Sequence, residues 1–327
     1  MNKIFFSLII LTLAFLPALS QEKRNAGLPP EQQASLSWIN NNGHELKPDS
    51  APANEDLTFL LKELKDKRVV GLGEASHGTH EFYMQKGRMI RYLITNGGFR
   101  SLAFEFPQPI IVPINNYLNT GKGNLKDLMR DMALYSTEEI YQLFEWIRDY
   151  NISKASEDRV MLIGLDNENY WSDPLTRDKW MAENLISWQQ ANKTKSIVWT
   201  HNVHLVKDTT SNYQSMGYHL KQQFGNKFYA IGFDTYEGTV NVLNGDEFEP
   251  HTFQSGENSF SATLAQAKHH SFFLPFPDDS PIAEVTSFIT NIYSNWQEFK
   301  PLPIKPGADF DALVFIRNTT ASIRLKQ

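Results

Sequence analysis

The chain has 327 residues, no cysteine and a formal net charge of −6 at pH 7. The absence of cysteine excludes disulfides, thiolate metal sites and a cysteine nucleophile. The modest acidity argues against nucleic acid as a partner, because nucleic-acid binding calls for a basic face. Aromatic residues make up 13% of the chain, which fits a well-filled core with a few aromatic side chains in a ligand pocket.

Residues 1–20 have the pattern of a secretory signal peptide. Lys3 supplies the positive charge, an apolar run follows, and small residues form a cleavage site before Gln21. The apolar run is too short to span a membrane readily, and no stop-transfer segment follows it. We therefore expect a periplasmic or secreted protein with no integral membrane segment in the mature chain. The expected organisation is a signal peptide over 1–20, an N-terminal arm over 21–55 and a single α/β domain over 56–327.

Apolar runs and helical spacings alternate along the next two hundred residues. The spacing of apolar residues predicts helices over 56–67, 81–96, 177–190 and 213–224, with two or three more between 107 and 158. Buried strands are predicted over 69–72, 99–106, 159–165, 196–200, 228–233 and 312–316. Beyond Gly238 the pattern predicts an antiparallel strand over 239–243 and a loop over 247–256. The alternation predicts an α/β fold with a mostly parallel sheet flanked by helices and a small antiparallel C-terminal addition.

The first five predicted strands each end in a titratable residue. These residues are Glu74 with His77, Glu105, Asp166, His201 with His204, and Asp234. The carboxyl ends of parallel strands meet at one edge of the sheet, where α/β proteins bind ligands. We therefore expect a functional site there, although Asp166 and Asp234 fit equally well as caps of the following helices.

The segment RVVGLGEASHGTH, residues 68–80, carries the strongest of these signals. Gly71 and Gly73 allow a tight turn after a buried strand, and polar residues follow. His77 comes three residues after Glu74, so the carboxylate can orient the imidazole as a general base requires. Ser76 is adjacent to His77, and neighbouring side chains on an extended turn usually diverge, so we expect Ser76 to support the site.

A second polar stretch, WTHNVH, follows the strand at 196–200. Two imidazoles, His201 and His204, within four residues of a strand end favour function over packing. Common hydrolase and nucleotide-binding motifs are absent: G-x-S-x-G, the P-loop, G-x-G-x-x-G and H-E-x-x-H do not occur. The remaining chemistry is a histidine base that drives water at an electrophilic carbon.

These motifs resemble the erythromycin esterase-like hydrolases. The matching pieces are GLGEASHGTHEF, FRSLAFE, RDKWMAENL, WTHNVH, MGYHL, YAIGF and FDALVF. The resemblance implies ester hydrolysis by histidine-activated water without a cofactor. We expect a small-molecule ester or glycan-like substrate, the latter because of the aromatic composition. It assigns the catalytic histidine to His77, the supporting acids to Glu74 and Glu105, and the second histidine pair to His201 and His204. It also aligns a basic residue of the family with Lys86, next to Arg88. We expect these two residues and Asp166, at its strand end, to bind substrate, and we expect no metal ligand.

The chain departs from this family between Asp166 and Arg177. Macrolide-degrading members carry a long helical insertion there that helps to roof the cleft, whereas this chain has only a short connection. A macrolide substrate therefore does not follow from the resemblance. Two alternatives remain open: a metal-dependent hydrolase that uses the same histidines and glutamates as zinc or manganese ligands, and a non-catalytic ligand-binding module of the cell envelope.

Overall fold

A computed structural model of the chain describes residues 30–48, 54–245, 247–297 and 300–326. The predicted signal peptide lies outside the described residues. None of the helices within those ranges has the length and apolar character needed to cross a membrane.

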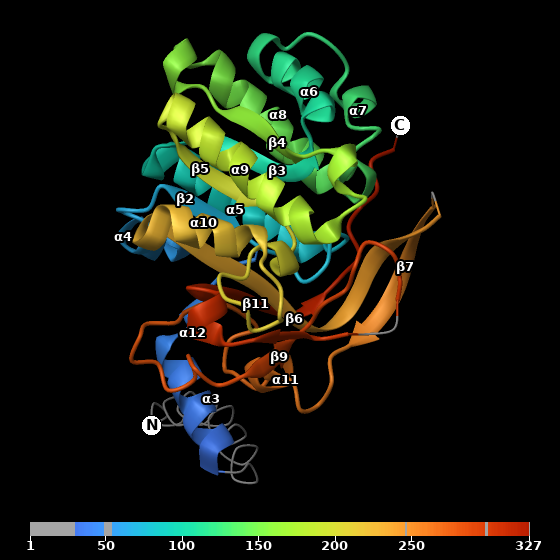
Figure 1. Ribbon diagram of the computed structural model, residues 1–327. Coiled ribbons are helices and arrows are strands. Elements are labelled where there is room, and N and C mark those ends of the chain that lie inside the picture. Colours follow the sequence, from blue (N-terminus) through green and yellow to red (C-terminus); the bar gives the residue numbers. More distant parts are fainter. Residues whose placement is uncertain (1–29, 49–53, 246, 298–299, 327) are drawn as a thin grey trace, which may run out of the picture.

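A large sheet forms the centre of the domain (Figure 1). Its strands are β1 (His44–Glu45), β2 (Val69–Leu72), β3 (Phe99–Pro107), β4 (Met161–Asp166), β5 (Lys195–Trp199), β6 (Phe228–Asn244), β7 (Glu247–Gln254), β8 (Ser271–Pro275) and β11 (Ala312–Thr319). The order is β1-β8-β11-β6-β2-β5-β3-β4, with β7 paired to β6. The run from β11 to β4 is parallel, and β1, β7 and β8 are antiparallel to their neighbours. The predicted fold class is confirmed.

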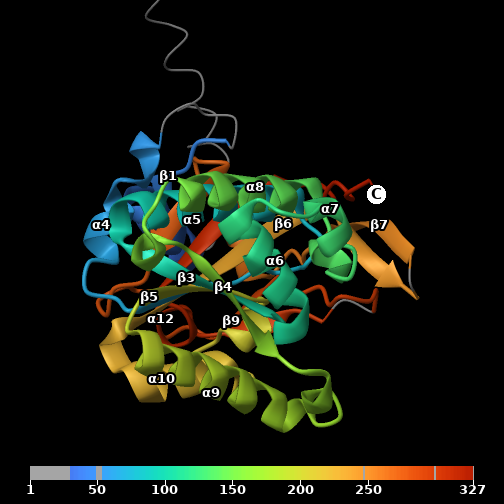
Figure 2. The ribbon, with the colours of Figure 1, turned by 90° about the horizontal axis from the view of Figure 1, so that it is seen from above.

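Helices cover both faces of this sheet. They are α3 (Pro30–Asn42), α4 (Phe59–Glu63), α5 (His80–Gly97), α6 (Gln108–Thr120), α7 (Leu125–Leu128), α8 (Glu138–Ile152), α9 (Pro174–Asn192), α10 (Met216–Phe224), α11 (Phe260–Leu264) and α12 (Pro306–Asp309). Figure 2 shows α5 and α8 on one side of the sheet and α9 and α10 on the other. A small two-stranded sheet pairs β9 (Ser287–Ile289) with β10 (Leu302–Ile304).

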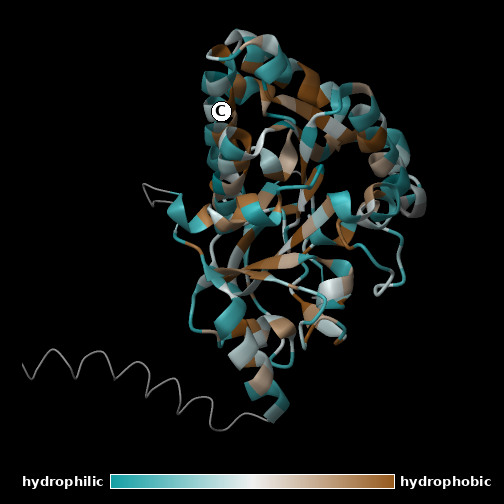
Figure 3. Ribbon diagram, turned by 90° about the vertical axis from the view of Figure 1, so that its left-hand side faces the viewer, coloured by the Kyte–Doolittle hydropathy of each residue, from teal (hydrophilic) through white to brown (hydrophobic). Residues whose placement is uncertain are grey.

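Two apolar cores form because successive side chains of a strand point to opposite faces. Val70 and Leu72 of β2 belong to the core that contains the apolar residues of α5 and α8. Val69 belongs to the other core, together with Met181 of α9 and Leu220 of α10. In Figure 3 the hydrophobic stretches run along the central strands, and hydrophilic colour marks the outward-facing turns of the helices. The strands are buried on both faces, which explains their nearly continuous apolar sequences.

The C-terminal third departs most from the predicted elements. β6 continues through Asp234 to Asn244 and does not end at residue 233. Its second half forms the predicted antiparallel strand, but its partner β7 occupies the segment that was predicted to be a loop. That prediction was wrong because β7 is mostly polar and, as the outer strand of a hairpin, needs few buried side chains. The strands β8, β9 and β10 were not predicted.

Much of the expected N-terminal arm packs against the domain. Leu36 and Ile39 of α3 are buried in the core that contains α9 and α10. His44 and Glu45 extend the main sheet by pairing with β8. Residues 30–42 of this arm thus form a helix that docks on the domain.

Candidate functional site

Four neighbouring parallel strands bring the predicted residues to one edge of the sheet. Glu74 follows β2, Glu105 lies near the end of β3, Asp166 ends β4 and His201 follows β5. These strands are adjacent in the order β2-β5-β3-β4. A shift of register between Phe104 and Pro107 interrupts the pairing of β3 with β4 at Glu105. Such irregularities re-aim side chains beside functional sites.

Glu74 is a completely buried carboxylate with four donors around it. Its Oε1 lies 2.8 Å from Nδ1 of His77 and 3.2 Å from the hydroxyl of Tyr135. Its Oε2 accepts hydrogen bonds from Nζ of Lys86 at 2.5 Å and from Nε1 of Trp199 at 2.9 Å. A carboxylate buried in an apolar surrounding requires this degree of pairing to remain ionised.

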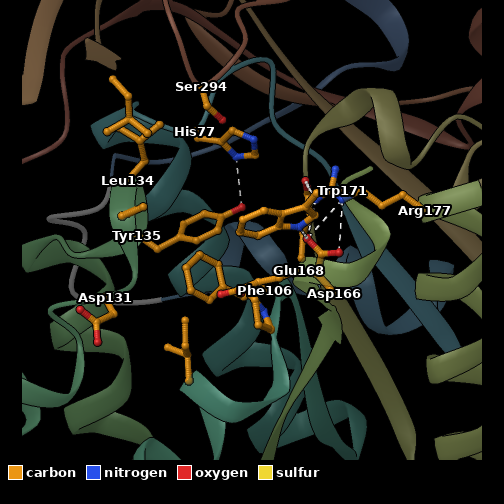
Figure 4. A pocket seen from close by; sticks show the side chains of 15 residues that line it. His77, Phe106, Asp131, Leu134, Tyr135, Asp166, Glu168, Trp171, Arg177 and Ser294 are labelled. Atoms are coloured by element: carbon orange, nitrogen blue, oxygen red, sulfur yellow. Dashed lines mark hydrogen bonds and ion pairs between the residues drawn. The ribbon is translucent and has the colours of Figure 1, made fainter. Parts of the chain in front are cut away.

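His77 lines a pocket beside Glu74. Because Glu74 accepts at Nδ1, that nitrogen carries the proton and Nε2 carries the free electron pair. No side chain in the described ranges is hydrogen-bonded to Nε2, and His77 lines the pocket (Figure 4). The hydroxyl of Tyr135 lies 3.1 Å from Nδ1, so it contacts the same side of the ring as Glu74. These contacts orient the His77 ring, as a general base requires.

His201 lies directly against His77, with 4.9 Å between the ring centroids. Its Nδ1 accepts a hydrogen bond from the backbone of Val203, and its Nε2 donates to the carbonyl oxygen of Ile292 at 3.2 Å. Burial and then the neighbouring His77 hold the pKa of His201 well below its usual range. His201 is therefore a neutral ring whose two nitrogens are both engaged.

His204 belongs to a second charged cluster. Its Nδ1 lies 2.7 Å from Asp178 and its Nε2 lies 3.1 Å from Glu105. Burial alone would lower the pKa of His204, but Asp178 and Glu105 raise it to about 10. The imidazolium in turn helps to hold the pKa of Glu105 well below its usual range, against the opposing effect of burial.

Arg177 joins this cluster to the pocket. Its guanidinium donates to Glu105 at 3.0 Å and to Asp166 at 2.7 Å, and the indole of Trp171 donates to the same Asp166 oxygen at 2.8 Å. Burial would lower the pKa of Arg177, but Glu105 and Asp166 keep it above its ordinary value. Arg177 lines the pocket and is thus its permanent cation (Figure 4).

The pocket beside these groups has a volume of about 400 Å³. Its walls combine apolar and aromatic side chains with the charged cluster. The lining includes Phe106, Ile110, Leu134, Tyr135, Trp171 and Leu243 next to His77, Glu105, Asp166 and Arg177. A cavity of this size and mixed character suits a small organic ligand with a polar reacting group.

Two of the predicted substrate-binding residues lie elsewhere. Lys86 is completely buried behind Glu74, where burial lowers its pKa to about 8, and it does not line the pocket. Arg88 pairs with Asp56 at 2.8 Å and also donates to the backbone of Lys47. Lys86 and Arg88 are two residues apart on α5, so their side chains point about 200° away from each other. Because Lys86 faces Glu74, Arg88 points away from the site. Asp166 does line the pocket, as predicted.

Asp234 also lies outside the site. It sits within β6, completely buried, and accepts hydrogen bonds from Ser261 at 2.8 Å and from the backbone of Thr290 at 3.0 Å. It therefore pins α11 and β9 to the sheet and does not cap the following helix. The predicted supporting position of Ser76 fits a hydrogen bond with Thr79 inside the turn.

Tyr135 was missed by the sequence reasoning. It lies in a short 3-10 helix, Ala133–Tyr135, in a segment with no regular apolar spacing. Ala133 has φ 44°, a left-handed conformation that is costly for a residue with a side chain and is often retained at functional sites. The indole of Trp199 was missed as well, although the residue lies in a motif that the sequence analysis singled out.

A comparison with known protein families shows which family this chain belongs to. The erythromycin esterase family model matches residues 94–176 and 167–319. This chain belongs to the erythromycin esterase family. Over 161 residues it is 35% identical to YbfO of Bacillus subtilis, covering 49% of this chain and 34% of that protein. It is 35% identical to erythromycin esterase type II of Escherichia coli over 113 residues, covering 34% of this chain and 26% of that protein.

Solved structures show the same fold. A crystal structure of a Bacillus cereus protein matches with a TM-score of 0.80 at 24% identity, covering 91% of this chain and 100% of that one. A mutant of the erythromycin esterase EreC in its open conformation matches with a TM-score of 0.68 at 16% identity, covering 88% of this chain and 99% of that one. The matched regions span about a third or less of the two curated relatives. None of these relatives supports a glycan-like ligand.

The donor geometry does not support the metal-ligand alternative. In the parts of the chain that the structure describes, no three histidine or carboxylate side chains are arranged to hold a metal ion. Both ring nitrogens of His204 are engaged with carboxylates, and those of His201 with the backbone. The ammonium of Lys86 and the guanidinium of Arg177 already occupy the carboxylates that a metal would need.

Proposed function

We propose that this member of the erythromycin esterase family hydrolyses an ester bond with a water molecule activated by His77. The contrast among three clustered histidines carries the proposal. His201 and His204 use both ring nitrogens within the protein, whereas His77 lines the pocket and its Nε2 has no hydrogen-bond partner among the described residues. A base must have an accessible electron pair, and this contrast supports His77 as the base.

The reaction follows from this arrangement. Nε2 of His77 takes a proton from water while the water oxygen forms a bond to the ester carbonyl carbon. The imidazolium that results is stabilised by the carboxyl group of Glu74, which lies 2.8 Å from Nδ1. As the tetrahedral intermediate collapses, the bond to the alkoxide oxygen breaks and the same proton passes from Nε2 to that oxygen. The products are a carboxylic acid and an alcohol, and His77 is neutral again.

Arg177 supplies positive charge for the developing oxyanion. It is the cation that lines the pocket, and Glu105 and Asp166 fix its guanidinium from behind. A preorganised cation at the oxygen that gains charge contributes more to the rate than one that must reorient. His201 and His204 are not available for this role, because their ring nitrogens are already engaged with Ile292, Val203, Glu105 and Asp178.

The test is a His77→Asn variant assayed on a panel of acyl esters and lactones that includes erythromycin. We expect kcat to fall at least about 100-fold, in line with the loss of a general base. A His219→Asn variant, on α10 and outside the pocket lining, serves as the matched control and should keep the parent rate. Full activity in His77→Asn would contradict the proposed function. Turnover of erythromycin would extend the substrate range to macrolides despite the short connection after β4.

We also propose that the protein is exported and acts in the periplasm or outside the cell. The charged start, apolar run and small-residue cleavage site of residues 1–20 support this. Expression of the full chain followed by cell fractionation and N-terminal sequencing should give a mature protein that begins at Gln21. Recovery of an uncleaved chain in the cytosol would contradict export and would leave the proposed chemistry unaffected.

A further inference from the structure

The charge around the pocket exceeds what its resident cations neutralise. Among the residues that the structure describes, three buried carboxylates, Glu105, Asp166 and Asp178, pair with two cations, Arg177 and His204. The nearby pair of Glu74 and Lys86 is balanced and adds nothing. One negative charge therefore remains uncompensated in the buried part of the site.

Two more carboxylates lie on the pocket lining. Asp131 and Glu168 are exposed, and neither forms an ion pair with a lysine or arginine within the described ranges. Figure 4 shows Asp131 on the side of Leu134 and Tyr135, and Glu168 beside Trp171. The two come from different segments, so negative charge flanks the pocket. Together with the buried excess, the lining gives the pocket a negative potential that attracts cations and repels anions.

Aromatic side chains line the pocket next to these carboxylates. Phe106, Tyr135 and Trp171 all line it, and the indole nitrogen of Trp171 is fixed on Asp166. The Trp171 side chain remains 56% exposed, so its ring is available to a ligand. Aromatic faces next to carboxylates are the surroundings that proteins use to bind ammonium groups, through cation–π attraction.

We propose that the ester substrate carries an ammonium group, which binds between these aromatic rings and the carboxylates Asp131 and Glu168. The inference rests on the proposed function and names the class of its substrate. The ester carbonyl lies at His77 and Arg177, and the cationic part of the molecule extends toward the acidic side chains. Esters that carry a negative charge away from the carbonyl are discriminated against.

The decisive substrates are an isosteric pair. Butyrylcholine and 3,3-dimethylbutyl butyrate have the same shape and the same acyl group, and differ by a quaternary nitrogen in place of a carbon. We expect kcat/KM to be about tenfold or more higher for butyrylcholine at low salt, from cation–π and ion-pair contributions together. The advantage should shrink as salt screens the exposed carboxylates. The butyrate ester of 3-hydroxypropanesulfonate should be the poorest substrate. Equal rates for the isosteric pair, or a preference for the sulfonate, would overturn the inference.

Two double variants separate the local carboxylates from net charge. Asp131→Asn with Glu168→Gln should reduce the preference for butyrylcholine over its neutral isostere about fivefold to tenfold. Glu157→Gln with Asp158→Asn makes the same change of charge just before β4, at the amino end of that strand and away from the pocket. This control should leave the preference for butyrylcholine over its neutral isostere at the parent value. An unchanged ratio in the first double variant would overturn the assignment of these two residues.

A binding measurement keeps this inference separate from the proposed chemistry. Choline and 3,3-dimethylbutanol are titrated calorimetrically into the full-length His77→Asn protein, whose fold is checked by its melting temperature. Tighter binding of choline supports the ammonium site even if no ester on the panel is hydrolysed. Binding of choline that is no tighter than that of the neutral alcohol overturns the inference, even if esters are hydrolysed through His77.

Discussion

Nδ1 of His77 lies 2.8 Å from Oε1 of Glu74, a carboxylate with no solvent exposure. The same carboxylate binds the buried ammonium of Lys86 through its other oxygen. Glu74 therefore has two roles that mutations can separate. It fixes the proton on Nδ1 of His77, and it compensates the buried positive charge of Lys86.

Replacing Glu74 by Gln should damage both activity and stability. The amide cannot accept all four donors, so the tautomer of His77 is no longer fixed, and kcat should fall between about 100-fold and 10,000-fold. The unpaired ammonium of Lys86 should reduce the free energy of unfolding by about 3–5 kcal/mol. The measurements are kcat on the best ester and urea unfolding.

The double variant Glu74→Gln with Lys86→Met distinguishes the two roles. Removal of the buried charge should restore most of the lost stability, because an apolar side chain needs no partner there. The activity should stay low. Recovery of activity together with stability would show that Glu74 acts only by holding Lys86.

Replacing Tyr135 by Phe should slow the reaction without unfolding the protein. The hydroxyl contacts both Glu74 and Nδ1 of His77, and one such hydrogen bond is worth about 0.5–1.5 kcal/mol net. We expect kcat to fall about threefold to tenfold. Tyr83→Phe is the matched control, because its hydroxyl donates to the carbonyl oxygen of Leu134 and touches neither group. Equal losses in both variants would remove Tyr135 from the positioning of His77.

The stability of the protein should fall as the pH rises from neutral, because of His204. Its pKa is raised from 6.5 to about 10 in the folded chain, so between these values the native state binds more protons than the unfolded state. The free energy of unfolding then decreases with pH by up to about 1.4 kcal/mol per unit. The stabilisation is complete below pH 6.5 and is lost by about pH 10.

The difference between the parent chain and a His204 variant, measured between pH 7 and pH 8, isolates this effect. Below that window Asp234, with a pKa raised to about 7, adds a slope of the same sign; above it Lys86, with a pKa lowered to about 8, adds an opposite one. A His204→Gln variant should have a flatter dependence of unfolding free energy on pH than the parent chain in urea unfolding. Identical slopes would mean that His204 does not carry its proton as described.

Replacing Gly78 by Ala should destabilise the turn that carries His77. A Cβ atom at Gly78 would lie 1.9 Å from the carbonyl oxygen of Asn241 in β6, and the same glycine accepts a backbone hydrogen bond from Asn241. The backbones must separate, which should cost about 1–3 kcal/mol. Melting temperature and kcat should both fall. Gly256→Ala, where a Cβ meets open space, should change neither; a parent-like Gly78→Ala protein would contradict this packing.

Local sequence determined much of this protein. The apolar runs predicted β2 to β5 within about two residues, because strands buried on both faces have continuous apolar sequences. The parallel arrangement then placed Glu74, Glu105, Asp166 and His201 at one edge, and the three-residue spacing of Glu74 and His77 predicted their contact.

Tertiary structure alone decided which of these groups faces the pocket. The sequence singled out His77 as the expected base but left the surroundings of His201 and His204 open. Only packing shows that these two rings use both nitrogens on partners such as Ile292 and Asp178. Tyr135 reaches the site from a segment without any regular pattern. Such contacts depend on how segments that are distant in the sequence pack against each other. The periodicity of one segment does not predict which segments will be its neighbours.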